Sequence, residues 1–434
     1  SSAIIQDLEQ RYCSSCSAAV ISPCFVSSRG FGERLVSRIY NGGRQAIYTA
    51  TMGAMLANNM ALPVYAASTT STTVLAGQTS TGLVANSGDM IAVYGVTSDT
   101  SINSGGSQYI YGGGKDYGAH ISGGRQTIKE GGSARGVHIS AGSQYIDYNA
   151  TAESTFISGG SQIVEGIAYH TNILSGGHQQ VDAWGLANST VISAHGSQIV
   201  NSVGSASDTI VLSAGSQIIS YGGKVNDTTI NSGGYQIINY GGSANITTIN
   251  GGEQKIYSGG VAISTTISRG HQNIFDNGLA KETNINSYGH QKISSGGSAI
   301  STIINRLGTQ YISNGGTAIS TIINSFGEQL IYSGGTANST TINSGGGQLL
   351  HAYGTANETI VNGSGYQYIY GSSAKAISTI INSGGKQEIG SGGSAIDTTI
   401  NSGGTQYVYN NCLASNTSIF GGTQFVYGSA NDTT

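Results

Sequence analysis

The stretch INSGGYQIINYGGSANITTINGGEQKIYSGG, residues 230–260, decides the fold of this chain. It contains no proline and only two charged side chains, and its Gly-Gly pairs recur within a few residues. Such a composition is typical either of a flexible low-complexity tract or of a short structural unit repeated in tandem. The spacing of the glutamines distinguishes these two interpretations.

Glutamines recur at intervals of 17 to 20 residues when the chain is aligned on Gly-Gly-x-Gln. Two positions after each of them stands Ile, Val or Leu, and the full unit reads SGGxQxIxxGGxAxxTxIN. A weaker copy, with Met90 in the glutamine position, reaches back to about residue 88. A period near 20 residues indicates a solenoid. The aligned residues are Gln108, Gln126, Gln144, Gln162, Gln179, Gln198, Gln217, Gln236, Gln254, Gln272, Gln291, Gln310, Gln329, Gln348, Gln367, Gln387, Gln406 and Gln424.

Each unit contains two short β-branched segments bounded by glycine; in one unit these are residues 236–238 and 247–249. No apolar spacing of three and four residues persists, and two glycine turns per unit disfavour a helix. Two short strands and two turns use about 19 residues. The sequence therefore predicts an all-β fold, a parallel β-solenoid (β-helix) of about 18–19 coils with roughly 19 residues per coil.

The repeated glutamine shares a strand face with the aliphatic residue two positions later, because side chains alternate across a strand. We therefore expect it to point inward, where stacked amides can hydrogen-bond from coil to coil. The alternative is an outward row of glutamines that forms a ligand track. The residues predicted to build this structural ladder include Gln108, Gln126, Gln236, Gln254, Gln310 and Gln367.

The composition favours an ordered chain without affinity for nucleic acid. Its 25 tyrosines and recurring Ile and Val argue against disorder, which goes with few aromatic and β-branched residues. Only 9% of residues are charged, the net charge is −4, and Lys and Arg are scattered. These values give no electrostatic case for nucleic-acid binding.

Residues 1–66 are predicted to be a leader. Four arginines between 29 and 44 precede the moderately apolar segment 46–68, which suits a secretory signal cleaved near Ala66. Asn58 and Asn59 make that segment too weak for a stable membrane span. Residues 67–87 would form a linker or an N-terminal cap, and residues 88–434 the repeat solenoid.

Cys13 and Cys16 have a spacing that could bind metal or act in redox chemistry, but they lack a second ligand pair. We interpret them, with Cys24, as thiols of the leader. The only other cysteine is Cys412, so no disulfide framework covers the repeats.

The tandem SGGxQxIxxGGxAxxTxIN units resemble the passenger domains of AIDA-type autotransporter adhesins of Gram-negative bacteria, including their self-associating TibA-like members. The resemblance covers about residues 88–434. It implies export through the periplasm, a C-terminal barrel that carries the passenger through the outer membrane, and a role in adhesion, autoaggregation and biofilm formation at the cell surface. It also implies a cytoplasmic heptosyltransferase that modifies serines or threonines of the repeats.

No stretch alternates as the strands of an outer-membrane barrel do, and the chain stops within a repeat at SANDTT, 429–434. We therefore expect that the C-terminal translocator barrel is absent and that the chain is a fragment or a processed passenger.

The serines of the Asn-Ser-Gly-Gly corners and their equivalents would stand in a regular exposed column. With the resemblance, they are candidates for O-glycosylation; the alternative is that serine simply favours turns. The candidates are Ser104, Ser158, Ser175, Ser232, Ser344, Ser383 and Ser402.

A catalytic centre would need carboxylates and cations gathered on one face, whereas charged residues do not stack at equivalent repeat positions here. His271 and His290 occupy equivalent positions in neighbouring units, with Glu253 one unit earlier, so a weak metal site is the alternative to an exposed polar pair. The sequence thus predicts no catalytic residue, no metal and no cofactor.

The leading hypothesis is a non-catalytic surface adhesin. Its outer face would associate with a second rod or with a host glycoprotein or glycan through many weak contacts. The alternatives are a β-helical polysaccharide-active enzyme and a structural stalk that presents a missing head. The tyrosines expected on the outer face include Tyr109, Tyr257, Tyr311, Tyr368 and Tyr407.

Overall fold

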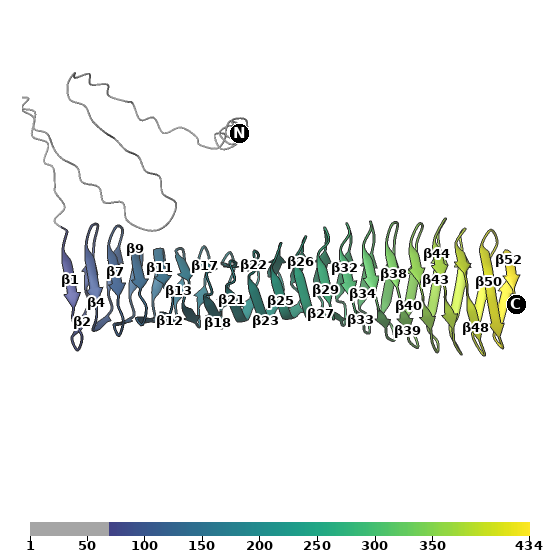
Figure 1. Ribbon diagram of the computed structural model, residues 1–434, viewed down its shortest axis with the longest axis horizontal. Coiled ribbons are helices and arrows are strands. Elements are labelled where there is room, and N and C mark those ends of the chain that lie inside the picture. Colours follow the sequence, from purple (N-terminus) through teal and green to yellow (C-terminus); the bar gives the residue numbers. More distant parts are fainter. Residues whose placement is uncertain (1–68) are drawn as a thin grey trace, which may run out of the picture. The chain divides into compact units, whose positions relative to one another are not determined.

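The structure is a computed structural model that describes residues 69–434. These residues form a parallel β-solenoid of about 19 turns with about 19 residues per coil, so the predicted fold class is confirmed. The coils follow one another as a row of rungs along a rod (Figure 1). The predicted leader, including Cys13, Cys16 and Cys24, lies outside the described residues.

All 52 strands of the described region belong to a single sheet. Every strand pairs in parallel with its equivalent one coil away, for example Gln291 with Gln310 and Gln310 with Gln329. At about 4.8 Å between paired strands, the coils make a rod of roughly 90 Å. No helix in this part of the chain is long and apolar enough to cross a membrane.

Most coils have three strands, whereas the sequence predicted two. In one of them, β34 (Thr309–Ile312) carries the glutamine, β35 (Thr317–Ile319) follows a glycine turn, and β36 (Ile322–Ile323) follows directly. Ser320, with φ at 56°, makes the corner between β35 and β36 alone. The prediction missed this corner because it assigned turns only to glycine-rich stretches, and one serine in the left-handed region is enough here.

The first face of the solenoid, which carries the glutamines, is built by β1 (Ser71–Val74), β4 (Met90–Val93), β7 (Ser107–Ile110), β14 (Ser161–Val164), β17 (His178–Val181), β20 (Ser197–Val200), β22 (Ser216–Ile219), β24 (Tyr235–Ile238), β26 (Glu253–Ile256), β28 (His271–Ile274), β31 (His290–Ile293), β34, β37 (Glu328–Ile331), β40 (Gly347–Leu350), β43 (Tyr366–Tyr370), β46 (Lys386–Gly390), β49 (Thr405–Val408) and β51 (Thr423–Val426). Two longer strands, β9 (His120–Ile128) and β11 (His138–Ile146), join the third face of one coil to the first face of the next.

The second face is built by β2 (Thr79–Thr81), β5 (Val96–Ser98), β8 (Lys115–Tyr117), β10 (Ser133–Arg135), β12 (Thr151–Glu153), β15 (Ile167–Tyr169), β18 (Leu186–Asn188), β29 (Leu279–Lys281), β32 (Ser298–Ile300), β35, β38 (Thr336–Asn338), β41 (Thr355–Asn357), β44 (Lys375–Ile377) and β47 (Ser394–Ile396).

The third face is built by β3 (Val84–Ala85), β6 (Ser101–Asn103), β13 (Phe156–Ile157), β16 (Asn172–Ile173), β19 (Val191–Ile192), β30 (Asn284–Ile285), β33 (Ile303–Ile304), β36, β39 (Thr341–Ile342), β42 (Ile360–Val361), β45 (Ile380–Ile381) and β48 (Thr399–Asn401). In other coils one strand spans the second and third faces without a break, namely β21 (Ser205–Val211), β23 (Lys224–Asn231), β25 (Ser243–Asn250), β27 (Val261–Ser268), β50 (Leu413–Phe420) and β52 (Ser429–Thr433).

The first coil begins before the recognisable repeats. Strands β1, β2 and β3 lie within residues 67–87, for which a linker or cap was expected, and they pair in register with the second coil, Ser71 opposite Met90.

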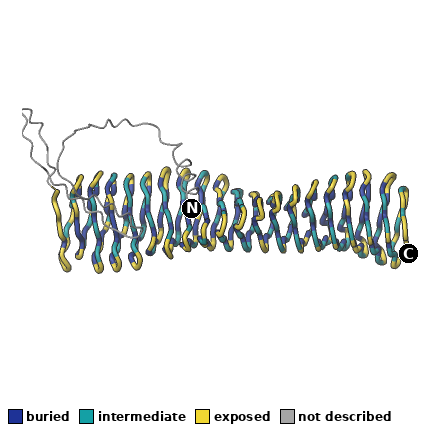
Figure 2. The backbone as a smooth tube through the Cα atoms, turned by 45° about the horizontal axis from the view of Figure 1, so that its top comes forward, coloured by how far each residue is buried: buried dark blue, intermediate teal, exposed yellow. Residues whose placement is uncertain are grey.

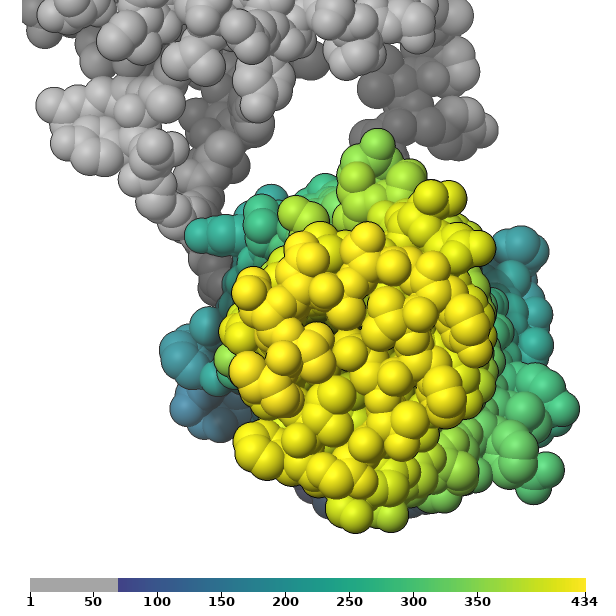
Figure 3. Space-filling model, turned by 90° about the vertical axis from the view of Figure 1, so that its right-hand side faces the viewer, coloured from purple at the N-terminus to yellow at the C-terminus, as the bar shows by residue number. Residues whose placement is uncertain are grey.

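Most coils contribute one aliphatic or alanine side chain per face to a continuous core. Ile312, Ala318 and Ile323 are fully buried, and their equivalents stack above and below them. Full burial of each isoleucine stabilises the fold by roughly 1.5–3 kcal/mol. Along the strands buried residues alternate with half-buried ones, while exposed residues gather at the corners (Figure 2). Side chains of the last coil fill the cross-section of the rod (Figure 3).

The Gly-Gly turn uses its two glycines for different reasons. Gly315 has φ at 79°, a conformation that other residues adopt at a cost. Gly316 has an ordinary φ, but a Cβ on it would lie 2.4 Å from the carbonyl oxygen of Ile293 in the preceding coil. Glycine therefore permits both the turn and the close stacking of coils.

Candidate functional site

The ladder glutamines point into the solenoid. Gln108, Gln126, Gln236, Gln254, Gln310 and Gln367 are all fully buried. From Gln126 onward, each side-chain amide donates to the side-chain oxygen of the glutamine one coil earlier, with Nε2 to Oε1 distances of 2.7 Å for Gln126 to Gln108 and 2.6 Å for Gln310 to Gln291. An outward ligand track is not what these side chains form; they satisfy one another inside the core.

A buried threonine column accompanies the glutamines, and sequence reasoning gave it no role. Thr302 donates from Oγ1 to Oε1 of Gln291 at 3.2 Å, while Thr155 accepts from Nε2 of Gln162 at 3.1 Å. The signal was present in the repeat, where threonine recurs two residues before the final Ile-Asn. The hydroxyls supply a second partner to amides that would otherwise have only one another.

Asp116 ends the glutamine ladder at its N-terminal side. Opposite Gln108 the preceding coil has Ile91, which cannot accept a hydrogen bond. Asp116, in a position that is mostly alanine in other coils, accepts from Nε2 of Gln108 at 3.1 Å and from Nε2 of Gln126 at 3.0 Å. Thr97 also donates to it at 2.7 Å. Burial raises the pKa of the Asp116 carboxyl, and these hydrogen bonds oppose that rise.

The seven candidate acceptor serines lie at the corner between the third and first faces. All are exposed: Ser104, Ser158, Ser175, Ser232, Ser344, Ser383 and Ser402. They belong to equivalent turns, so their hydroxyls lie in one column along the rod. The hydroxyl of Ser344 lies 2.8 Å from that of Ser364, and Ser158 is 3.5 Å from the carbonyl oxygen of Ile139.

A second serine column lies at the corner between the second and third faces. Ser301, Ser320 and Ser339 each make this corner with positive φ, and all three are exposed. Beside them the outward isoleucines of the third face form the floor of two hollows of about 480 and 470 Å³ that share Ser339 and Thr341. We call this feature the corner groove. Its rim also carries Glu282, Glu358 and Asp397.

The outer side of the first face carries many aromatic rings. The predicted outward residues Tyr109, Tyr257, Tyr311, Tyr368 and Tyr407 are all half-buried there. Rings of neighbouring coils stack on one another, with centroids 5.6 Å apart for Tyr257 and Phe275 and 4.9 Å apart for Tyr407 and Phe425. The stacking covers part of each ring and leaves the rest exposed to solvent.

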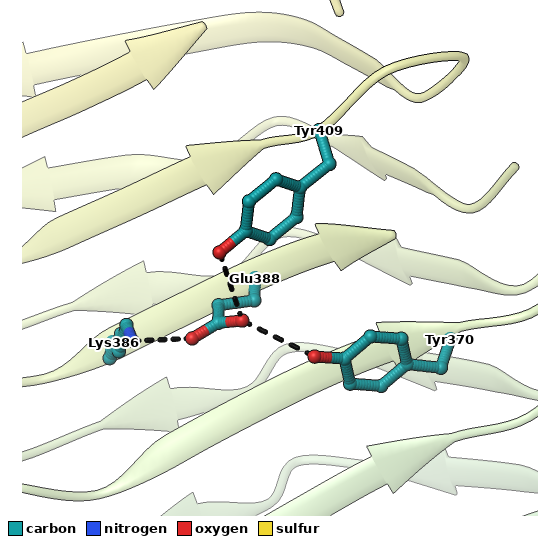
Figure 4. Close-up of polar contacts among 4 residues, drawn as sticks. All are labelled: Tyr370, Lys386, Glu388 and Tyr409. Atoms are coloured by element: carbon teal, nitrogen blue, oxygen red, sulfur yellow. Dashed lines mark hydrogen bonds and ion pairs between the residues drawn. The ribbon is translucent and has the colours of Figure 1, made fainter. Parts of the chain in front are cut away.

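One carboxylate on this face is enclosed by tyrosines. Glu388 is only 7% exposed, and its Oε2 accepts from the hydroxyls of Tyr370 at 3.3 Å and Tyr409 at 3.4 Å. Lys386 pairs with its other oxygen (Figure 4). Burial and the nearby carboxylate raise the pKa of both tyrosines, and the hydrogen bond to Glu388 raises the pKa of Lys386. This cluster ties three successive coils together.

Two pairs of histidines are stacked, His120 on His138 and His271 on His290. His271 and His290 lie with ring centroids 5.3 Å apart. Glu253, the third member of the weak metal site considered above, instead contacts Lys255 at 3.2 Å and Asn273 at 2.6 Å. Within residues 69–434, no group of three or more His, Cys, Asp or Glu side chains is arranged to hold a metal ion.

Among solved structures, the chain is similar to a TibA fragment that was crystallised after hyper-glycosylation catalysed by TibC. The two are 36% identical with a TM-score of 0.58, and the match covers 61% of this chain and 99% of the fragment. The chain belongs to the TibA-like, AIDA-type autotransporter adhesins. Its β-solenoid is therefore an adhesin-like passenger structure.

Weaker similarities lie outside this family. A tailspike protein of E. coli bacteriophage HK620, crystallised with a hexasaccharide, matches at 11% identity and a TM-score of 0.26 over 84% of this chain and 73% of its own. A double mutant of that tailspike matches at 9% identity and a TM-score of 0.25 over 84% and 72%. Similarity at this level says nothing about the function of a TibA-like adhesin. No protein-family model and no curated protein matches the chain.

Two features on the outside of this TibA-like solenoid, the corner serines and the aromatic cluster of the first face, differ in how often they recur. The corner serines belong to turns that recur in almost every coil. The enclosed Glu388 and the aromatic rings of the first face are particular to certain coils. Recurring features suit a modification added many times, and local ones suit recognition of a partner.

Proposed function

We propose that this chain is the non-catalytic passenger of an autotransporter adhesin, displayed on the surface of a Gram-negative bacterium after export directed by residues 1–66. It mediates autoaggregation, biofilm formation and adhesion to host glycoproteins or glycans. The observation that carries the proposal is the 36% identity to the TibA fragment over 99% of that fragment. The structure contributes a rod of low charge with hydroxyls and partly exposed aromatic rings along its outside, features that suit many weak contacts between like rods.

Self-association of this kind depends on the number of coils. Deleting residues 144–235 removes whole Gln-to-Gln units and joins Ser143 to Gln236, so the ladder and the register are kept. Because weak contacts add along the rod, we expect cell aggregation, measured by settling of cells that display the chain, to fall at least tenfold. Deletion of the single unit 236–253 serves as the control and should reduce settling only slightly.

An unchanged settling rate after the larger deletion, with equal surface display, would contradict the proposal. It would instead favour a stalk whose repeats only set the distance of a binding head from the cell.

The proposal includes O-glycosylation of the corner serines by a cytoplasmic heptosyltransferase. Its support is the exposure of Ser232, Ser383 and Ser402 in one column, together with the fact that the TibA fragment was glycosylated by TibC. One sugar per coil would give the rod a regular hydrophilic ridge.

Mass spectrometry tests this assignment. The chain is produced with and without such a glycosyltransferase, and its peptides are mapped. We expect a ladder of added heptose masses that falls by one step for each of Ser232→Ala, Ser383→Ala and Ser402→Ala. Sugar found on Ser301, Ser320 and Ser339 would overturn it and assign the modification to the corner groove.

A further inference from the structure

Four successive coils carry large residues where other coils have glycine. Arg269, Tyr288, Leu307 and Phe326 stand at the turn before the glutamine, with φ between 57° and 61°. The same position is Gly384 and Gly403 further along, with φ of 77° and 76°. For a bulky L-residue this left-handed conformation is energetically unfavourable.

These side chains do not offset that cost by burial. Tyr288 is 61% exposed and Phe326 is 62% exposed, and Leu307 between them is exposed as well. The backbone ladder continues through them, since Tyr288 donates to Leu307 and Leu307 to Phe326, both at 2.9 Å. The three side chains therefore form a ridge of exposed apolar groups along successive coils.

A hollow of about 550 Å³ lies beside this ridge. Its opposite wall is Tyr366, whose hydroxyl donates to Oε1 of Glu328, two coils earlier, at 3.4 Å. The ring can lie there because the intervening coil has Gly347, on which a Cβ would stand 2.2 Å from Cζ of Tyr366. The hollow is lined by Tyr288, His290, Leu307, Gly308, Thr309, Phe326, Glu328, Gly345 and Tyr366.

The lining combines ring faces with a few hydrogen-bonding groups. Glu328 can accept hydrogen bonds, while Thr309 and Tyr366 can both donate and accept. No Lys or Arg side chain is among the lining residues; Arg306 instead lies over the Phe326 ring, 5.5 Å from its centroid. Burial, together with the charges of His271 and Lys292, lowers the pKa of His290, so its imidazole is neutral at pH 7. An anionic ligand in the hollow would lie beside the Glu328 carboxylate, with no cationic side chain among the lining residues.

We propose that this hollow, between the Tyr288–Leu307–Phe326 ridge and Tyr366, binds a neutral glycan unit. The C–H face of a sugar ring packs against the Tyr288 and Phe326 rings, and its hydroxyls donate to Glu328. The inference rests on the proposed adhesin function and deepens it by assigning the glycan contact to particular residues.

The test compares the purified chain with the double variant Tyr288→Gly/Phe326→Gly on immobilised oligosaccharides. The array holds neutral members that end in galactose, N-acetylglucosamine or fucose, and sialylated and sulfated members. We expect the wild-type chain to bind neutral members and the double variant to bind at least tenfold more weakly. Because glycine suits this turn, the variant should have an equal or higher Tm, so lost binding cannot be lost folding.

Tyr353→Gly is the matched control. Tyr353 also has a positive φ, 60°, and is 61% exposed, but it lies at a different corner and does not line the hollow. Its replacement should leave glycan binding unchanged. Gly347→Ala is the complementary variant, since the added Cβ displaces Tyr366 from Glu328 and should weaken binding while every lining side chain remains.

Wild-type binding of no neutral member, equal binding by the double variant, or binding of acidic members alone would each overturn the proposal. Loss of self-association by the double variant in sedimentation, without glycan binding by the wild-type chain, would also overturn it and assign the ridge to contact with a second copy. Aggregation of cells through the remaining coils is a separate readout, so failure here leaves the adhesin proposal to its own test.

Discussion

The inner and outer sides of the first-face strands follow different rules, although they are made by alternate residues of the same segments. Inward, each strand from Gln108 onward presents a glutamine and an aliphatic residue. Outward, the residue between them changes from Tyr109 to Thr127 to Tyr145 in the first three units. Each inward side chain must donate a hydrogen bond to the previous coil and accept one from the next. Glutamine does both. The interior therefore specifies the fold, and recognition belongs to the exterior.

The sharpest way to break this difference is to put an apolar residue into the ladder. In Gln310→Leu, Nε2 of Gln329 loses its acceptor at 2.7 Å, and Oε1 of Gln291 loses the shorter of its two hydrogen bonds, at 2.6 Å, and keeps the one from Thr302 at 3.2 Å. Both atoms stay buried, so we expect a loss of about 2–4 kcal/mol. Because a solenoid can unfold locally, hydrogen exchange of residues 290–331 is the measurement, and exchange there should accelerate more than in distant coils.

The neighbouring residue provides the control for that experiment. Tyr311→Thr changes the outward side chain of the same strand to the residue that Thr127 already supplies in another coil. We expect a smaller loss of about 0.5–1.5 kcal/mol, since Tyr311 is half-buried and its ring contacts His290. Equal acceleration of exchange in both variants would show that inward and outward side chains contribute equally to stability, which would contradict the difference between the two sides.

Much of the interior could be predicted from the sequence because it is periodic. The interval between glutamines predicts the coil, and the aliphatic residue two positions later predicts that the glutamine points inward. The third face was missed because Ser320 and its equivalents look like ordinary strand residues; nothing local marks a single residue that takes positive φ. Only the stacking of coils fixes that conformation.

The exterior could not be predicted in the same way. The contact of Tyr366 with Glu328 joins residues that are 38 positions apart, and it depends on Gly347 between them. In the sequence that glycine looks like one more member of a glycine-rich turn. The enclosure of Glu388 likewise needs tyrosines from the coils on both sides. Such contacts depend on the particular residues that neighbouring coils carry at outward positions, and the repeat unit does not specify those residues.

Asp116 is an interior residue that departs from the repeat. We expect its substitution to change stability less than Gln310→Leu does. Its pKa is raised above 3.8 in the folded chain, chiefly by burial, so folding favours its protonated form. The stabilisation that follows is complete below pH 3.8 and is lost as the pH rises through the folded-state pKa. Asp116→Asn does not titrate and places an amide beside the Nε2 donors of Gln108 and Gln126. We therefore expect that the stability of the wild-type chain relative to Asp116→Asn increases on acidification from pH 7 toward pH 4. Hydrogen exchange of residues 96–128 in both proteins measures this difference in stability. If the stability of the two proteins changes in parallel with pH, the Asp116 carboxyl does not stabilise the fold through a raised pKa.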